Sequence, residues 1–131
     1  MTLAQGFIAA AITALILVAF LHSYFGETRL LSPLFKHQGN SILENDFARK
    51  VLRYAWHLTS LLWIMIAICL YAVAFHPTDL STIVLLTIGI GFLFIGLFDL
   101  VVSRGRHIGW PALTAIGIFS LAAYVAGGVS L

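Results

Sequence analysis

Residues 58–98 read LTSLLWIMIAICLYAVAF-HPTD-LSTIVLLTIGIGFLFIGLF, two long apolar runs on either side of a four-residue turn. Neither run contains Lys, Arg, Asp or Glu. About 20 apolar residues are needed to cross the hydrocarbon of a bilayer as a helix, and a helix lets a single span satisfy its own backbone hydrogen bonds. The pattern therefore predicts two antiparallel transmembrane helices, with Pro77 ending the first of them.

Two further apolar runs flank this pair, at residues 3–21 and 108–131. Of the 131 residues, 61% are hydrophobic and only 9% are charged, whereas soluble domains carry about 25% charged residues. The predicted fold class is therefore all-α: a four-transmembrane-helix bundle, a polytopic membrane protein with one integral membrane domain over residues 1–131. The expected spans cover approximately residues 3–25, 46–75, 80–102 and 108–130.

The basic residues predict how these spans are oriented. All seven Lys and Arg lie in two segments, one between the first and second runs and one between the third and fourth. The positive-inside rule places both segments in the cytoplasm and both termini on the non-cytoplasmic side. No basic residue precedes the first run, so we expect a retained helix rather than a cleaved signal peptide. The expected location is the bacterial inner (plasma) membrane.

Several local signals predict where helices begin, end and touch. Gly26 is typical of a C-cap and should end the first helix. The sequence SILE at residues 41–44 fits a capping box, which would start the second helix near Ile42, outside the membrane. Pro111 suits the first turn of the fourth helix. On the third helix a small-residue face favours close helix contact, and its members recur every seven residues: Thr82, Gly89 and Gly96.

Ionisable residues gather at one predicted depth, the cytoplasmic edge of the bundle. Each lies at the cytoplasmic end of an apolar run or in the turn just beyond it: His22, Glu27, His57, Asp99 and His107. Two helices run inward and two run outward, so we expect these side chains to arrive at one level. Arg53 and Ser60 share the helical face of His57 and are expected to support the cluster through hydrogen bonds.

Imidazole together with carboxylate suits transition metals, and helix bundles commonly build such sites from facing helices. We therefore expect a transition metal ion (Fe, Zn or Cu) or a haem in a redox or metal-handling role, with bis-histidine ligation as the haem variant. The expected ligands are His22, His57, Asp99, Glu27 and His107. This prediction rests on topological convergence alone, because the chain has no His-Glu-x-x-His or Glu-x-x-His motif. The same residues also suit structural ion pairs at a membrane surface, such as Asp99 with a neighbouring arginine.

Other functions stay open at this point. Small size and small-residue faces suit a non-catalytic accessory subunit packed against a larger membrane complex, or a homo-oligomer. A membrane enzyme acting on a lipid or other amphiphile would use a hydrophobic pocket that opens toward a polar cytoplasmic mouth. Aromatic residues suit either such a pocket or a lipid-facing core: Trp63, Tyr71, Phe92, Phe94, Phe98 and Tyr124. A transporter has least support, because no span carries an ionisable residue beyond the cytoplasmic edge.

Three remaining features are expected to carry no function of their own. Cys69 is the only cysteine, and we expect it to be a small buried hydrophobe. His37 and His76 are expected to be solvated loop residues. The basic residues are few and adjoin the spans, so the lipid bilayer is the expected partner and nucleic acid is not.

Overall fold

The computed structural model describes residues 1–36, 39 and 41–127, and every regular element in this part of the chain is a helix. The all-α prediction is therefore confirmed. In chain order the elements are α1 (Leu3–Phe25), the π-helix η1 (Gly26–Leu31), α2 (Ser32–Lys36), α3 (Ser41–Glu44), α4 (Asp46–Phe75), the 3-10 turn η2 (Pro77–Asp79), α5 (Leu80–Ser103) and α6 (Trp110–Val125). His37 lies outside the described residues.

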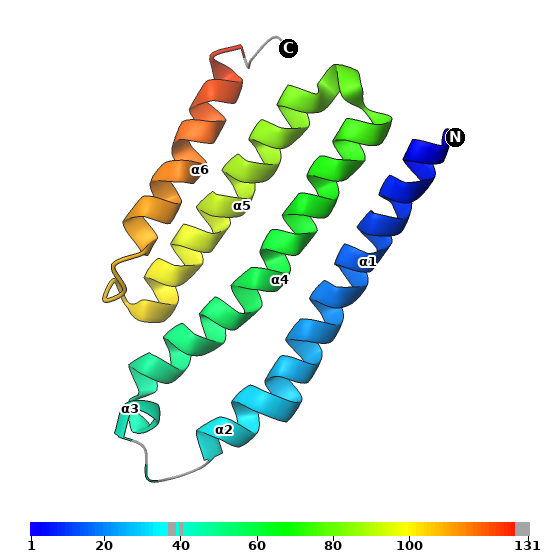
Figure 1. The fold of residues 1–131 in the computed structure, drawn as a ribbon. Helices are drawn as coiled ribbons and strands as arrows, with labels where there is room; N and C mark the ends of the chain where they lie inside the picture. The colour runs from blue at the N-terminus through cyan, green and yellow to red at the C-terminus, as the bar shows by residue number, and fades with distance from the viewer. Residues whose placement is uncertain (37–38, 40, 128–131) are drawn as a thin grey trace.

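The four long helices lie side by side in the order α1, α4, α5, α6, with the two ends of the chain at the same end of the layer (Figure 1). Extensive contacts join α1 to α4, α4 to α5 and α5 to α6. No comparable contact joins α1 to α5 or α4 to α6 within the described residues. The helices therefore meet at three separate seams, and side chains on different seams are kept apart even when they lie at the same depth.

Three of the helical segments are long and apolar enough to cross a membrane: Leu3–Lys36, Asp46–Phe75 and Pro77–Ser103. The helix α6 is apolar as well but has only 16 residues, about 24 Å at 1.5 Å per residue. It begins with Pro111 in its first turn, as the sequence predicts. The expected fourth span reached residue 130, and its last residues lie outside the described part of the chain.

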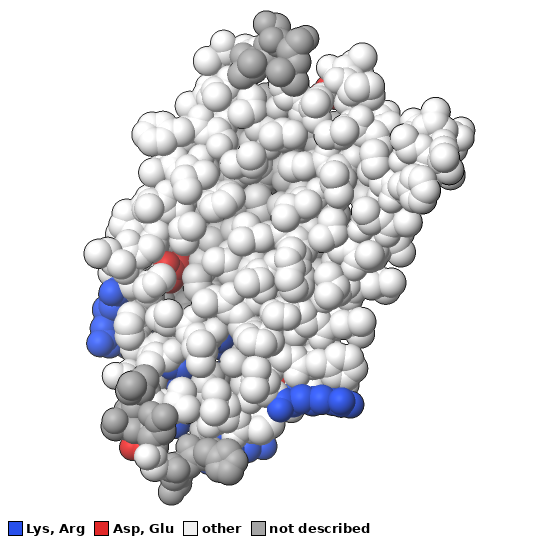
Figure 2. All heavy atoms as spheres, in the orientation of Figure 1, with Lys and Arg blue, Asp and Glu red and all other residues white. Residues whose placement is uncertain are grey.

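Lys and Arg gather at one end of the layer. Figure 2 shows them around the lower part of the molecule, with no Lys or Arg on the surface in view above them and only a few red carboxylate atoms there. They belong to η1, α2, the first turns of α4 and the connection between α5 and α6. We call this region the basic end.

Gly26 is the C-cap of α1, as predicted, but it does not have the left-handed conformation typical of a glycine cap. Its backbone is right-handed helical, with φ −59° and ψ −45°, and the chain continues into η1. The glycine is needed for a different reason: a Cβ atom there would stand 1.9 Å from Nε1 of Trp56. Because Gly26 has no side chain, the indole on α4 packs directly against the backbone of α1.

The start of the second long helix also differs from the prediction. The short helix α3 ends at Glu44, and α4 begins separately at Asp46. Asn45 caps α4, because its Oδ1 accepts from the backbone N–H groups of Phe47 and Ala48. The Glu44 carboxylate accepts from the N–H of Gly39 instead. An unbroken helix from Ile42 is therefore wrong, and the long helix begins at Asp46.

The seam between α5 and α6 is the closest of the three because glycines line it. A Cβ on Gly96 would stand 2.5 Å from the backbone nitrogen of Thr114, and one on Gly117 would stand 2.5 Å from that of Leu93. A Cβ on Gly89 would meet the side chain of Leu121 at 2.6 Å. The predicted close contact of the small-residue face is confirmed at Gly89 and Gly96, with α6 as the partner.

Candidate functional site

Glu27 is the centre of a polar cluster at the seam between α1 and α4, near the basic end. Its carboxylate accepts from Arg53 through Nη2 at 2.9 Å and Nε at 3.0 Å. Ser32 donates its hydroxyl to Oε1 at 2.7 Å. Ser32 is five residues past Glu27, and the i to i+5 hydrogen bonding of a π-helix brings such residues together. The π-turn of η1 is therefore what places the Ser32 hydroxyl on this carboxylate.

These partners lower the pKa of Glu27, which lies past residue 25, the end of the expected span. The hydrogen bond from Ser32 contributes most, and the bonds from His57 and Arg53 add to it. Partial burial acts in the opposite direction and is outweighed. Because the charged form of a carboxylate is favoured by hydrogen-bond donors and by a nearby cation, Glu27 is held ionised.

His57 connects Glu27 to two serine hydroxyls. Its Nε2 lies 3.3 Å from Oε2 of Glu27, and its Nδ1 lies 3.0 Å from Oγ of Ser23. Ser23 in turn donates to Oγ of the buried Ser60 at 2.9 Å. Both ring nitrogens of His57 are therefore engaged by the protein itself. The sequence placed Arg53 and Ser60 beside His57, and the structure brings all three into this cluster.

His22 lies at the same seam with different neighbours. Its ring stacks on that of Trp56 with 4.3 Å between ring centroids, and its Nε2 lies 3.0 Å from Oγ1 of Thr59. The Trp56 indole donates to the backbone carbonyl of His22 at 3.1 Å. His22 therefore belongs to an aromatic contact between α1 and α4. It shares no hydrogen-bond partner with His57 among the interactions of the described residues.

Asp99 and His107 form a second, separate pair. Asp99 is 2% exposed on α5, and its Oδ2 lies 2.6 Å from Nδ1 of His107 in the connection before α6. This pair lies where α5 leads into α6, whereas the cluster around Glu27 lies where α1 and η1 meet α4. The five residues that the sequence placed together at the cytoplasmic edge are thus divided into two groups. His22, Glu27 and His57 lie at the seam between α1 and α4, and Asp99 and His107 lie between α5 and the start of α6.

The expected metal or haem site gains no support from this arrangement. Within the described residues, no group of three or more His, Cys, Asp or Glu side chains is placed to hold a metal ion. His57 and Glu27 offer one imidazole and one carboxylate, and both are occupied by protein partners. The metal and haem hypotheses therefore stay predictions from the sequence.

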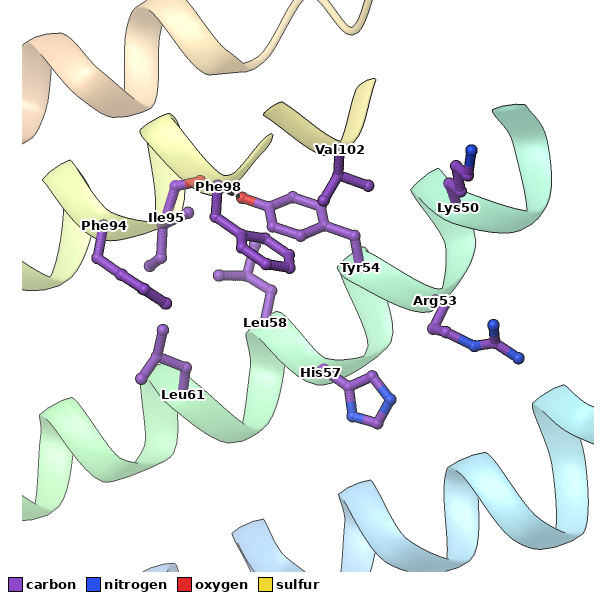
Figure 3. Close-up of a pocket in the computed structure, with 10 residues that line it drawn as sticks. All are labelled: Lys50, Arg53, Tyr54, His57, Leu58, Leu61, Phe94, Ile95, Phe98 and Val102. Carbon is purple, nitrogen blue, oxygen red and sulfur yellow. Dashed lines mark hydrogen bonds between the residues drawn. The ribbon is translucent and has the colours of Figure 1, made fainter. Parts of the chain in front are cut away.

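An apolar groove of about 450 Å³ runs between α4 and α5. Tyr54 closes one side of it by donating its hydroxyl to the carbonyl of Ile95 at 2.9 Å, and its ring stacks with that of Phe98. Figure 3 shows Phe94 and Phe98 of α5 on the side of the groove that faces Leu58 and Leu61 of α4. Lys50 and Arg53 extend from α4 at the end away from Phe94. The lining residues are Lys50, Arg53, Tyr54, His57, Leu58, Leu61, Phe94, Ile95, Phe98 and Val102.

A smaller polar pocket of about 180 Å³ adjoins this groove at the basic end. The two cavities share Lys50 and Val102. Ser103 lines the polar pocket, is 3% exposed, and has a hydroxyl with no hydrogen-bond partner among the described residues. The full lining is Asn45, Asp46, Phe47, Lys50, Val102, Ser103, Arg104 and Arg106.

The sequence reasoning found part of these cavities and missed the rest. It named Phe94 and Phe98 as possible pocket residues, and both line the groove. It did not name Tyr54, Lys50 or Ser103. A helical stripe was visible in the sequence, since residues 50, 54, 58 and 61 recur at spacings of four and three and share a face. The unpaired hydroxyl of Ser103 has no such signal, because it depends on packing against other helices.

Comparison with protein-family models, with curated proteins and with solved structures finds no match for this chain.

Proposed function

We propose that this chain is a four-span integral membrane protein that binds an amphiphile between α4 and α5. The acyl or prenyl chain of the amphiphile occupies the apolar groove, and its polar head lies at the basic end. One observation carries the proposal: a groove of about 450 Å³ with an apolar lining lies next to a polar pocket, and Lys50 and Val102 line both. An amphiphile requires an apolar site beside a polar one, and pockets between helices are common ligand sites.

The orientation of the protein completes this proposal. Both basic segments face the cytoplasm and both chain ends face the opposite side, because Lys and Arg are retained on the cytoplasmic side of bacterial inner membranes. In support, the start of α1 and the end of α6 lie at the same end of the layer in Figure 1, and the cations gather at the other end in Figure 2. The groove then opens at the level of the cytoplasmic leaflet, where lipid headgroups supply its ligand.

The polar cluster at the neighbouring seam, between α1 and α4, supports this function by holding two side chains of the groove in place. Arg53 and His57 line the groove and are also bound to Glu27 of η1. Because these contacts cross from α4 to α1, they fix the side chains that border the groove. We propose that Glu27 positions Arg53 and His57 rather than meeting the amphiphile itself.

The experiment that tests the chain site uses phosphatidylcholine and phosphatidic acid in parallel, each with a photoactivatable diazirine in its acyl chain. Purified protein is reconstituted with each lipid, irradiated and digested. Labelled peptides are expected to contain residues 54–61 and 94–102. Leu58→Trp fills the groove and should reduce labelling of these peptides severalfold. The matched control is Ile66→Trp, at an exposed position of the same helix. Equal labelling in wild type and Leu58→Trp would reject the groove as the site.

The sequence-based metal hypothesis has its own test, which is independent of the lipid experiment. Elemental analysis and an absorption spectrum of the purified protein report bound metal or haem. If the hypothesis holds, His57→Ala loses the metal while membrane insertion is intact, because insertion depends on the apolar run that follows His57. Its control is His76→Ala, in the distant η2 turn. Metal-free wild-type protein would reject the hypothesis.

A further inference from the structure

We propose that the polar pocket beside the groove binds a phosphomonoester, so that the amphiphile of this protein is a phosphorylated lipid. The inference rests on the proposed function and adds the chemical class of the head. Its basis is the composition of the pocket, one buried hydroxyl without a partner, and the position next to the apolar groove.

The charge of the pocket matches a phosphomonoester. Its lining carries three cationic side chains, Lys50, Arg104 and Arg106, and one anionic side chain, Asp46. A phosphate monoester carries about −1.5 to −2 charges at neutral pH. The net positive charge of the lining is therefore about equal to the negative charge that a phosphomonoester would bring.

The buried hydroxyl of Ser103 can donate a hydrogen bond that no other described residue accepts. Only 3% of the surface of Ser103 is exposed, and its Oγ has no partner within the described residues. Leaving a buried hydroxyl without a partner is unfavourable, so this group favours a ligand that can pair with it. A phosphate oxygen accepts from serine, and Ser103 lines the same pocket as the three cations.

One of the two helix ends at this pocket, the N-terminus of α4, favours an anion. Asn45, Asp46 and Phe47 are the cap and first turn of α4, and the N-terminus of a helix carries a partial positive charge. The end of α5 at this pocket is its C-terminus, and it is capped. The N–H group of Arg104 donates to the carbonyl of Val101, and that of Gly105 donates to the carbonyl of Leu100. The left-handed backbone of Arg104, with φ 53°, makes this turn and keeps that arginine at the pocket.

The same lining argues against a choline head. A quaternary ammonium group needs a free carboxylate or an open aromatic face. Asp46 is already paired with Lys50 at 2.7 Å, and the guanidinium of Arg106 lies 4.7 Å from the ring centroid of Phe47. Both groups that would attract choline are therefore engaged. The pocket selects a phosphate with no cationic substituent.

The test compares ligands with identical chains on the purified full-length protein in detergent, measured by native mass spectrometry. Phosphatidic acid should bind at least about tenfold more tightly than diacylglycerol or phosphatidylcholine, the size of effect expected for hydrogen bonds to a charged group. Ser103→Ala should weaken phosphatidic acid binding about fivefold and Arg106→Gln about tenfold, with diacylglycerol binding unchanged. The control is Arg29→Gln, which removes an exposed cation of η1 outside both cavities.

Each other outcome overturns a stated part of the proposal. Equal affinity for phosphatidic acid and diacylglycerol, with groove labelling intact, rejects the phosphate pocket and leaves the proposed chain site standing. An equal loss in Arg29→Gln and Arg106→Gln means diffuse attraction by the basic end rather than a built pocket. If inorganic phosphate or glycerol 3-phosphate binds as tightly as phosphatidic acid, the pocket takes a soluble phosphate and the lipid is rejected. Absence of binding by any chain-bearing ligand rejects the proposed function itself.

Discussion

Gly26 and Trp56 are in direct contact across the seam between α1 and α4. A Cβ on Gly26 would stand 1.9 Å from the indole Nε1 and 2.4 Å from Cε2, and the same indole donates to the carbonyl of His22. The backbone of one helix thus serves as the packing surface for an aromatic ring of the other. The polar cluster around Glu27 begins one residue later, so its geometry depends on this contact.

The first prediction concerns that contact. Gly26→Ala should destabilise the protein by about 1–3 kcal/mol, because overpacking forces the indole or the backbone to move. Gly6→Ala on the same helix is the control, since its nearest neighbour outside the helix is 3.9 Å away, and alanine is favoured over glycine in a helix. Thermal unfolding in detergent measures both. An unchanged midpoint in Gly26→Ala would show that the two helices do not approach as described.

The second prediction concerns the titration of Glu27. Its pKa is lowered from the usual value of 4.5, chiefly by the Ser32 hydroxyl. A lowered folded-state pKa stabilises the protein above the unfolded-state pKa, and this stability is lost as the pH falls through the lowered value. Wild type should therefore lose stability as the pH falls below 4.5, and Glu27→Gln should lose less over the same interval.

Ser32→Ala separates the cause of this shift from other effects of pH. Removing the hydroxyl should raise the pKa of Glu27 toward 4.5, because Ser32 is the largest contributor. NMR of a labelled Glu27 carboxyl measures the midpoint directly. Thr28→Ala is the control, since its hydroxyl bonds the carbonyl of Tyr24 and not the carboxylate. A midpoint that is the same in wild type and Ser32→Ala would contradict the role given to the π-turn.

The third prediction concerns the buried pair between α5 and α6. His107→Ala should destabilise the protein by about 1–3 kcal/mol, because Asp99 is 2% exposed and would lose the hydrogen-bond partner of its carboxylate. His76→Ala is the matched control: its imidazole bonds the Tyr71 hydroxyl at 3.0 Å, but both side chains are exposed. Thermal unfolding of the two variants should therefore differ, and equal midpoints would mean that the Asp99–His107 pair does not form.

The fourth prediction concerns the proposed membrane topology. A reporter enzyme that is active only outside the cytoplasm should work when fused after the C-terminus or inserted in the loop at Pro77. It should be silent when inserted at Gly105, which lies between Arg104 and Arg106. Activity at Gly105 would contradict a four-span arrangement and would require α6, with its 16 residues, to remain on one side of the membrane.

The sequence predicted where the long helices lie along the chain and that residues 58–98 form a helical hairpin, but not how the polar residues are divided among the seams. Apolar runs locate helices along the chain because the length of a run is matched to the bilayer. They do not show which face of a helix meets which neighbour. Asp99 and His107 were therefore expected beside His57, although His57 binds Glu27 and Ser23 whereas Asp99 pairs with His107. Gly26 was predicted as a helix cap from its place after an apolar run, but its contact with Trp56 depends on packing between helices and has no signal in the sequence.

The π-helix η1 has a consequence for insertions and deletions in this protein. Each residue of an α-helix turns the chain by about 100°, and a π-turn holds one residue more than an α-turn in the same place. Deleting one of the residues 28–31, between Glu27 and Ser32, would restore regular α-helix and rotate the chain before this turn relative to the chain after it. Ser32 would then leave Glu27 even though both residues are still present. The bond between them depends on the number of residues in this one turn, so homologous chains should vary in sequence here more readily than in length.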